Sequence, residues 1–233
     1  VATTGRPGPV LIDIPKDIQF KKGIYQSEEK IEIDSYRPNY KGDPDQIEKA
    51  VEMISQAKKP IFYTGGGVIN AGEKASEILR ELVSTTGFPI TSTLQGLGCY
   101  PGEDSQFLGM LGMHGTFEAN NAMHDCDLMI NIGARFDDRI TGMVSKFSPN
   151  SKKIHIDIDP SSINKIVKVD VAIVGDAQSI MSTMLEIIKK KYPGFKNSNK
   201  EKISDWWKQI EKWREKKSLS FKAVSYTHLT LPT

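Results

Sequence analysis

The sequence lacks most of the features that would assign a function class directly. Its two cysteines, Cys99 and Cys126, show no C-x-x-C spacing, which argues against a disulfide framework and a cysteine-ligated metal. We expect two buried, inert thiols in a reducing compartment. No apolar run approaches the roughly 18–20 residues that a membrane-spanning helix needs. The chain opens on Val1, without Met or a signal segment, so we interpret it as an internal piece of a longer protein.

Familiar catalytic motifs are also missing. The absence of G-x-x-x-x-G-K-[ST] argues against a P-loop nucleotidase, and no G-x-S-x-G nucleophile elbow is present. His114, His124 and His155 show no metal-ligand spacing. His155 falls in a strand pattern, which favours a core or hydrogen-bonded role. The sequence therefore offers no base, nucleophile or metal cluster sufficient for catalysis.

Basic residues are concentrated near the end of the chain. Residues 189–222 hold 12 Lys/Arg against 4 Asp/Glu, although the whole chain carries only +2. Acidic residues interleave the lysines, which favours a solvated helical linker over a nucleic-acid footprint. Trp206, Ile210 and Trp213 follow helical spacing, and we interpret them as a face that docks on a neighbouring domain. Aromatic stacking on a nucleic acid is the alternative, and core or interface packing is the more common of the two.

The middle of the chain alternates strand and helix patterns. Strands are predicted at residues 60–64, 89–93, 127–132, 153–158 and 171–174. Helices are predicted at residues 45–57, 116–125 and 177–190, and from an Asn70/Glu73 capping box through Val83. The alternation predicts an α/β fold, a Rossmann-like parallel sheet with helices on both faces. A further apolar strand, at residues 10–14, has no partner nearby in sequence.

Small and charged residues follow these strands. Ligands of parallel sheets bind at the carboxyl ends of the strands, so these turns are predicted to share one edge. Three glycines, Gly65 to Gly67, suit either a phosphate-binding turn or a plain tight turn. Asp157 and Asp159 suit ribose hydroxyls or a solvated turn. Residues 133–139 hold two arginines and two aspartates, which suit an anion clamp or a surface ion-pair network. Together they predict a site for a phosphate-containing dinucleotide.

Five sequence pieces in order carry a family resemblance. They are Arg-Pro-Gly-Pro-Val at 6–10, Asp-Ile-Pro-Lys-Asp at 13–17, Thr-Leu-Gln-Gly-Leu-Gly at 93–98, Gly-Met-His-Gly at 112–115 and Gly-Ala-Arg-Phe-Asp-Asp-Arg at 133–139. In this combination the chain closely resembles the acetohydroxyacid (acetolactate) synthase family of thiamine-diphosphate enzymes, over about residues 1–222. The first piece alone is common to many thiamine-diphosphate enzymes.

The resemblance implies a division of the chain into parts. Residues 1–16 would end an N-terminal pyrimidine-binding domain and 17–42 would form a linker. Residues 43–191 would be the central FAD-binding domain, and 192–222 a helical linker toward a C-terminal diphosphate-binding domain. The catalytic glutamate of the family would lie upstream of Val1. The Gly-Asp-Gly metal motif of the family is absent from this sequence, since Gly175-Asp176-Ala177 does not match it. Residues 223–233 break the pattern abruptly and are interpreted as a non-native tail.

The resemblance also implies an activity. The family condenses two pyruvates, or pyruvate with 2-ketobutyrate, to a 2-acetohydroxy acid with loss of CO2, in the biosynthesis of isoleucine, valine and leucine. Thiamine diphosphate with Mg²⁺ supplies the chemistry, and FAD undergoes no net redox step. The isolated fragment is predicted to be inactive.

Motif by motif, the resemblance assigns residues to two roles. The FAD contacts would be Arg6, Gly65, Gly66, Gly67, Thr93, Leu94, Gln95, Leu111, Gly112, Met113, His114, Gly133, Ala134, Arg135, Asp137, Arg139, Asp157, Ile158, Asp176 and Ala177. The substrate channel, where inhibitory herbicides bind in this family, would include Lys16, Met113, Asp138 and Arg139. Catalytic residues and metal ligands would lie outside this chain.

The resemblance also implies partners and a localisation, and two alternative functions remain open. The complete protein would be a cytoplasmic homo-oligomer, a dimer or tetramer, acting on 2-keto acids, with a possible regulatory small subunit and no membrane or nucleic acid. A related flavin-dependent thiamine enzyme such as pyruvate oxidase is the first alternative. A free-standing dinucleotide-binding module is the second.

Overall fold

A six-stranded parallel sheet forms the centre of the molecule. The computed structural model describes residues 1–25, 27, 33 and 35–220, and the predicted non-native tail lies outside them. Within these residues the strands are β1 (Pro60–Thr64), β2 (Ile90–Ser92), β3 (Phe107–Met110), β4 (Leu128–Ile132), β5 (Lys152–Asp157) and β6 (Val171–Val174). Their order is β3-β2-β1-β4-β5-β6, with every neighbouring pair parallel. The predicted fold class is confirmed.

The direction of winding reverses in the middle of this sheet. Strands β1, β2 and β3 progress outward on one side of the centre, and β4, β5 and β6 progress outward on the other. Central strands β1 and β4 are buried along their whole length, which explains their continuous apolar runs. Open α/β sheets bind ligands at such a reversal point, beyond the carboxyl ends of the strands.

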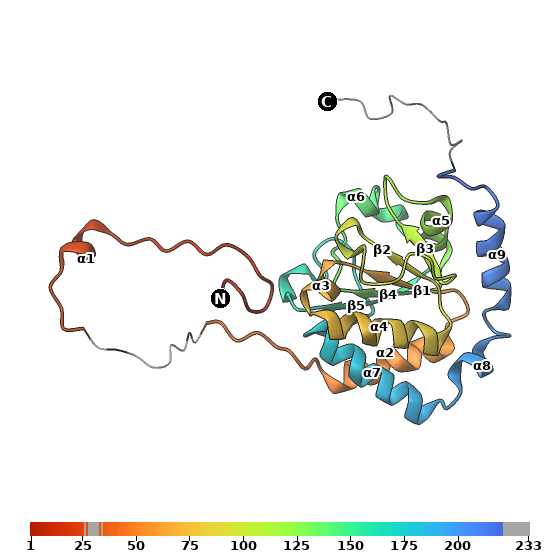
Figure 1. The fold of residues 1–233 in the computed structure, drawn as a ribbon, viewed down its shortest axis with the longest axis horizontal. Coiled ribbons are helices and arrows are strands. Elements are labelled where there is room, and N and C mark those ends of the chain that lie inside the picture. The colour runs from red at the N-terminus through yellow and green to blue at the C-terminus, as the bar shows by residue number, and fades with distance from the viewer. Residues whose placement is uncertain (26, 28–32, 34, 221–233) are drawn as a thin grey trace, which may run out of the picture.

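Helices cover both faces of the sheet (Figure 1). One face is covered by α2 (Pro44–Gln56), α4 (Glu73–Thr86) and α7 (Ala177–Lys191), which pack on one another. The other face is covered by α5 (Phe117–Asp125) and α9 (Ser204–Arg214). Helix α2 shows why: Ile47, Val51 and Ile54 recur on one side and are buried, while Asp43 caps the first turn by accepting from two backbone amides. The predicted helices α2, α4, α5 and α7 are confirmed.

Several elements were not predicted. They are the short helices α1 (Lys16–Phe20), α3 (Gly66–Asn70), α6 (Asp138–Thr141) and α8 (Phe195–Asn199), the turns of 3₁₀-helix η1 (Leu94–Gly96), η2 (Val144–Lys146) and η3 (Pro160–Ser162), and strand β3. In β3, Gly109 has φ +84° and the pairing register with β2 shifts. A residue with positive φ interrupts the alternation that identifies a strand, so the sequence pattern was hidden.

Two expected features are wrong. Asn70 does not cap α4: it is the last residue of α3, and Gly72 precedes α4 without a side-chain cap. Residues 10–14 form no strand, because no described strand pairs with them. They extend away from the sheet with residues 9–25 (Figure 1), and Leu11 and Ile12 are 93% and 77% exposed.

One face of the tryptophan helix packs in the core, an arrangement that the sequence favours together with interface packing. Trp206 and Ile210 of α9 are buried against α5 and the sheet of this same domain. The Trp206 indole nitrogen donates to the Pro60 carbonyl oxygen at 3.0 Å, at the start of β1. Helix α9 therefore completes the core of the central domain instead of presenting this face to a neighbouring one.

Two expectations about isolated residues are confirmed. Cys99 and Cys126 are free, buried thiols, and burial raises the pKa of Cys126 to about 11 despite a hydrogen bond with Ser148. His155 is fully buried and hydrogen-bonded. In the part of the chain that the structure describes, no helix has the length and apolar content to span a bilayer.

Candidate functional site

One cavity runs along the carboxyl edge of the sheet. Its volume is about 1180 Å³, above the range of about 300–1000 Å³ usual for small-molecule pockets. Turns after all six strands reach it. Of the residues assigned to the site from the sequence, it is lined by Arg6, Gly66, Gly67, Thr93, Leu94, Gln95, Leu111, Met113, His114, Gly133, Ala134, Arg135, Asp137, Arg139, Asp157, Ile158, Asp176 and Ala177. We call this cavity the edge groove.

Four assigned residues do not line the edge groove. Gly65 lies below it, buried against the backbone of Gly133. Gly112 supports the wall by exchanging two hydrogen bonds with the Asn120 side-chain amide, at 2.8 and 3.0 Å. Asp138 starts α6 and is exposed. Lys16 starts α1, on the extended N-terminal arm, and is exposed away from the groove.

The glycines act mainly by allowing two turns to touch. The amide of Gly67 donates to the Gly133 carbonyl oxygen at 3.0 Å, across the reversal point between β1 and β4. A Cβ on Gly133 would lie 2.6 Å from the Gly67 Cα, and Gly133 has φ +62°. Only glycine satisfies both conditions. The two turns therefore meet and form a floor of bare backbone beneath the edge groove.

The loop at residues 133–139 is fixed from below by buried polar side chains. The Ala134 carbonyl oxygen accepts from the Asn131 side-chain amide at 2.8 Å and from His155 Nε2 at 3.0 Å. Since a carbonyl oxygen only accepts, His155 carries its proton on Nε2. Its Nδ1 meets no partner among the described residues. These bonds explain why two polar residues occupy the interior of central strands.

The next residues of the same loop are held by aromatic contacts. The Tyr63 hydroxyl donates to the Arg135 carbonyl oxygen at 3.2 Å. Burial, together with the nearby Asp137 carboxylate, raises the pKa of Tyr63 above its ordinary value, so the hydroxyl keeps the proton that it donates. The Phe136 ring is buried 6.0 Å from the Tyr63 ring and 5.2 Å from the His155 ring. Buried contacts thus hold the loop on the side of the sheet, and its charged side chains line the edge groove.

Charged residues of both signs face the edge groove. Arg6, Arg135 and Arg139 supply positive charge from two distant segments. Asp137 lies 3.7 Å from the Arg135 guanidinium and caps α6 through the Arg139 amide, at 3.1 Å. Asp137 thus pairs with an arginine that faces the groove, as the ion-pair interpretation expects, whereas the anion clamp stays a prediction.

Two carboxylates lie in the half of the groove that the ends of β5 and β6 form. Asp157, at the end of β5, accepts from the Asp159 amide at 2.9 Å and is 8% exposed. Asp176 caps α7 by accepting from the Ser179 amide at 2.9 Å. Carboxylates only accept hydrogen bonds when ionised, so this half suits a ligand rich in hydroxyl groups.

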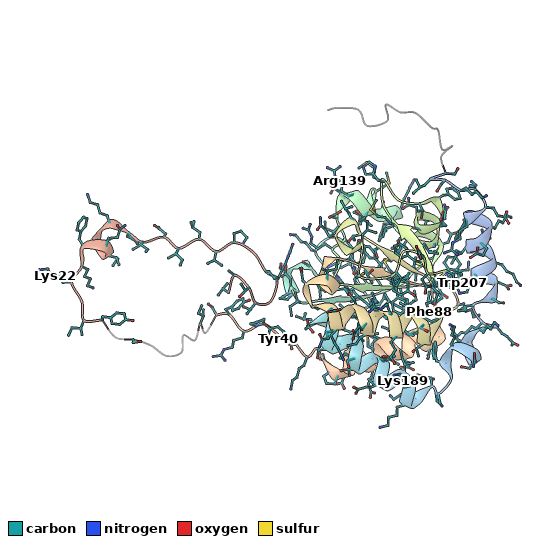
Figure 2. All side chains as sticks on the ribbon, in the orientation of Figure 1. Lys22, Tyr40, Phe88, Arg139, Lys189 and Trp207 are labelled. Carbon is teal, nitrogen blue, oxygen red and sulfur yellow. The ribbon has the colours of Figure 1, made fainter. Side chains whose placement is uncertain are left out.

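Some residues that line the groove were not anticipated. The most informative is Tyr40, in the segment expected to be a linker, which Figure 2 labels where the arm joins the domain. The sequence signal that could have identified Tyr40 is the presence of isolated tyrosines in the otherwise polar segment 17–42. The others include Thr3, Thr4, Gly5, Pro7, Ile69, Asn70, Leu97 and Ile140. Pro7 and Leu97 lie in the quoted motifs, but the resemblance assigned their neighbours to the site and not these two residues.

No metal centre forms in the part of the chain that the structure describes, since no group of three His, Cys, Asp or Glu side chains there could hold a metal ion.

A known protein family matches the part of the chain that forms the sheet. The family model for the central domain of thiamine pyrophosphate enzymes matches residues 47–184.

Acetolactate synthase large subunits are similar along most of the chain. That of Haemophilus influenzae is 47% identical over 228 residues, which cover 97% of this chain and 39% of that protein. Isozyme 3 of Escherichia coli is 44% identical over 223 residues, covering 95% and 38%. A probable large subunit from Methanocaldococcus jannaschii is 46% identical over 188 residues, covering 79% and 32%. The chain spans about two fifths of the length of the first two relatives.

The domain match extends over more than half of the chain and coincides with the six-stranded sheet and its edge groove. The chain therefore belongs to the thiamine pyrophosphate enzymes, and it carries their central domain.

Proposed function

We propose that this chain is the central part of an acetolactate synthase catalytic subunit and that its edge groove binds FAD. The observation that carries the proposal is the convergence of all six strand ends on one groove of about 1180 Å³, with mixed charge along it. The similarity to acetolactate synthase large subunits supports the same activity. The complete enzyme would join two pyruvates, or pyruvate and 2-ketobutyrate, with loss of CO2.

The groove chemistry fits a flavin dinucleotide. FAD combines a diphosphate with a ribose and a ribityl chain that carry several hydroxyls. Arginines from residues 6 and 133–139 suit the diphosphate, because a guanidinium presents a fork of donors to anionic oxygens. Asp157 and Asp176 suit the hydroxyls. The bare floor formed by Gly67 and Gly133 allows a ligand to approach the backbone closely.

The residues of the chain would bind and orient, and other parts of the protein would perform the chemistry. Thiamine diphosphate with Mg²⁺ would supply the carbanion-stabilising chemistry when bound. We propose that Arg139 and Met113, exposed at the mouth of the groove, line the substrate channel and that Arg139 meets the carboxylate of the second keto acid. Asp138, exposed beside them, and Lys16, on the distant arm, are proposed for the same channel in the complete protein.

The proposal extends to the setting of the complete protein. We propose a homo-oligomer with 2-keto acid substrates, together with a regulatory subunit in the manner that the names of the large-subunit relatives suggest. The buried free thiols Cys99 and Cys126 suit the reducing cytoplasm.

The test uses the complete subunit, purified without added flavin and then supplied with thiamine diphosphate, Mg²⁺ and FAD. We expect acetolactate from pyruvate, FAD released on denaturation in a one-to-one ratio with subunit, and no net loss of the absorbance of the oxidised flavin during turnover. Pyruvate-dependent bleaching of the flavin with acetate formation would instead identify an oxidase. Absence of bound flavin would refute the proposed role of the edge groove.

A further inference from the structure

The N-terminal segment forms one wall of the edge groove. Residues 3–7 line it, although the sheet begins more than fifty residues later. Figure 1 shows the N-terminus lying beside the sheet domain, at the base of the extended arm. A segment without secondary structure needs specific contacts to hold such a position. Two sets of contacts do so.

The first contact is an ion pair that spans 153 residues of sequence. Arg6 Nη1 donates to Asp159 Oδ2 at 2.9 Å. The carboxylate is fixed independently of Arg6: Oδ1 accepts from the amide and hydroxyl of Ser161 at 2.9 and 2.7 Å, and Oδ2 accepts from the Ser162 hydroxyl at 3.1 Å. Asp159 follows directly after β5, so the sheet sets its place. Arg6 therefore meets a prepositioned acceptor.

The second set of contacts holds the backbone of the same segment. The Tyr36 hydroxyl donates to the Thr4 carbonyl oxygen at 2.6 Å, and the Gly5 amide donates to the Tyr40 hydroxyl at 3.3 Å. Tyr40 is in turn fixed to the sheet edge, because its carbonyl oxygen accepts from the Asp176 amide at 2.9 Å. Gly5 has φ +60°, and a Cβ there would lie 2.8 Å from the Tyr36 hydroxyl oxygen.

We propose that Asp159 is a positioning residue, which holds Arg6 at the wall of the edge groove so that its guanidinium receives the diphosphate of the bound dinucleotide. Tyr36 and Tyr40 fix the backbone that carries Arg6. The inference rests on the proposed FAD site. A guanidinium has five N–H donors, so a bond to one carboxylate oxygen leaves most of them for a ligand. Asp159 thus neutralises part of the positive charge of Arg6, but it fixes the direction of the remaining N–H donors of the guanidinium.

The direction in which the loss of Asp159 changes the affinity for an anionic ligand tests the proposal. If Asp159 only neutralised Arg6, its loss would strengthen the binding of an anionic ligand, since the groove would gain positive charge. If it positions Arg6, its loss weakens binding. The substitution Asp159→Asn keeps the size of the side chain and removes the charge, so it separates the two possibilities.

The experiment is a titration of the flavin-free complete subunit with FAD, followed by flavin fluorescence. We expect Asp159→Asn to raise the Kd for FAD about tenfold, as the loss of one well-oriented charge-assisted contact would. In an Arg6→Ala background the same substitution should change the Kd less than about twofold, because nothing remains to be positioned. Tyr36→Phe should raise the Kd by a smaller factor. Asp205→Asn, an exposed carboxylate on α9, is the matched control and should leave the Kd unchanged.

A second readout separates failure of this inference from failure of the FAD site. Hydrogen exchange of the backbone amides of residues 3–6 reports the order of the segment without any ligand. Faster exchange there in Asp159→Asn, but not in Asp205→Asn, would support the anchoring step even if the wild-type subunit bound no FAD. Unchanged exchange, a Kd lowered by Asp159→Asn, or equal effects of Asp159→Asn with and without Arg6 would each overturn the proposal.

Discussion

At the scale of single residues, the groove places opposite charges on neighbouring side chains. Arg139 is exposed at the mouth, and its backbone is fixed at both ends. Its amide donates to Asp137 Oδ1 at 3.1 Å and its carbonyl oxygen accepts from the Met113 amide at 3.3 Å. A fixed backbone with an exposed guanidinium suits the recognition of a carboxylate that arrives from solution.

Arg139→Ala in the complete subunit should therefore damage the joining of the second keto acid more than the loss of CO2 from the first. We expect acetolactate formation to fall at least about tenfold, while CO2 release from pyruvate falls less, because one charge-assisted contact is lost only in the second step. Parallel assays of acetolactate and CO2 measure the ratio. Arg80→Ala, on the exposed side of α4, is the control. Equal losses of both activities would contradict the assigned role.

Asp159 gives a prediction about acid. Burial alone would raise its pKa, but hydrogen bonds from Ser161, Arg6 and Ser162 outweigh burial and lower the pKa from 3.8 to about 2. A lowered carboxyl pKa stabilises the folded state above the ordinary value, and this contribution is lost as the pH falls toward the lowered value. The difference in thermal stability between the wild type and Asp159→Asn should be constant from pH 7 to about pH 4.5 and shrink below about pH 4. A difference that shrinks already between pH 7 and 5 would contradict this.

At the scale of elements, the sequence predicted the regular parts and missed the irregular ones. Strands β1 and β4 were found because buried apolar runs ended at glycine, and α2 because its apolar residues recur at helical spacing. The edge that carries the candidate site followed from strand direction and from the small and charged residues after the strands, whereas the individual residues came from the family resemblance. Strand β3 was missed because Gly109 interrupts it, and the position of residues 3–7 depends on side-chain contacts across 153 residues, which no local pattern encodes.

The meeting of the β1 and β4 turns gives a prediction at this scale. Gly133→Ala would place a methyl group 2.6 Å from the Gly67 Cα and strain a backbone with φ +62°, so the turns must separate. We expect a loss of stability of at least about 2 kcal/mol and weaker FAD binding. Gly102→Ala, where a Cβ meets nothing within 4 Å, is the control. Thermal unfolding and FAD titration of both variants test this, and equal behaviour of the two would refute it.

Helix α9 gives a second prediction, because its tryptophan face is buried in the core of the sheet domain. Trp206 is 2% exposed, bonds to the Pro60 carbonyl oxygen and stacks edge-on with Trp213 at 5.7 Å. Trp206→Ala should cost about 3–5 kcal/mol and release α9 to proteases. Lys208→Ala, on the exposed side of α9, should change stability by less than about 0.5 kcal/mol. Limited proteolysis with mass identification of the first cleavage site distinguishes them, and a protected α9 in Trp206→Ala would contradict this packing.

At the scale of the whole molecule, turns from all six strands meet at the edge groove, which we propose as a binding site. The described residues bring arginines, aspartates and bare backbone to the edge groove, and they form no metal centre. The exposed apolar residues of the arm, such as Leu11 and Ile24, at 93% exposure each, have no partner surface in this structure. The sequence resemblance assigns Leu11 to the end of a neighbouring domain and Ile24 to a linker, so a strand at residues 10–14 would need a partner from outside the described residues.

The family resemblance predicts that the 233-residue chain by itself makes no acetolactate. The resemblance places the glutamate that activates thiamine and the Gly-Asp-Gly motif that holds Mg²⁺ in other parts of the protein, and the role proposed for the groove residues is to orient FAD. The chain, purified and supplied with pyruvate, thiamine diphosphate, Mg²⁺ and FAD, should give no colour in an acetoin assay, whereas the complete subunit should. FAD titration of the same preparation tests the proposed site in the lone chain, because turns from all six strands line the groove. Acetolactate from the lone chain would show that the residues described here perform the chemistry themselves.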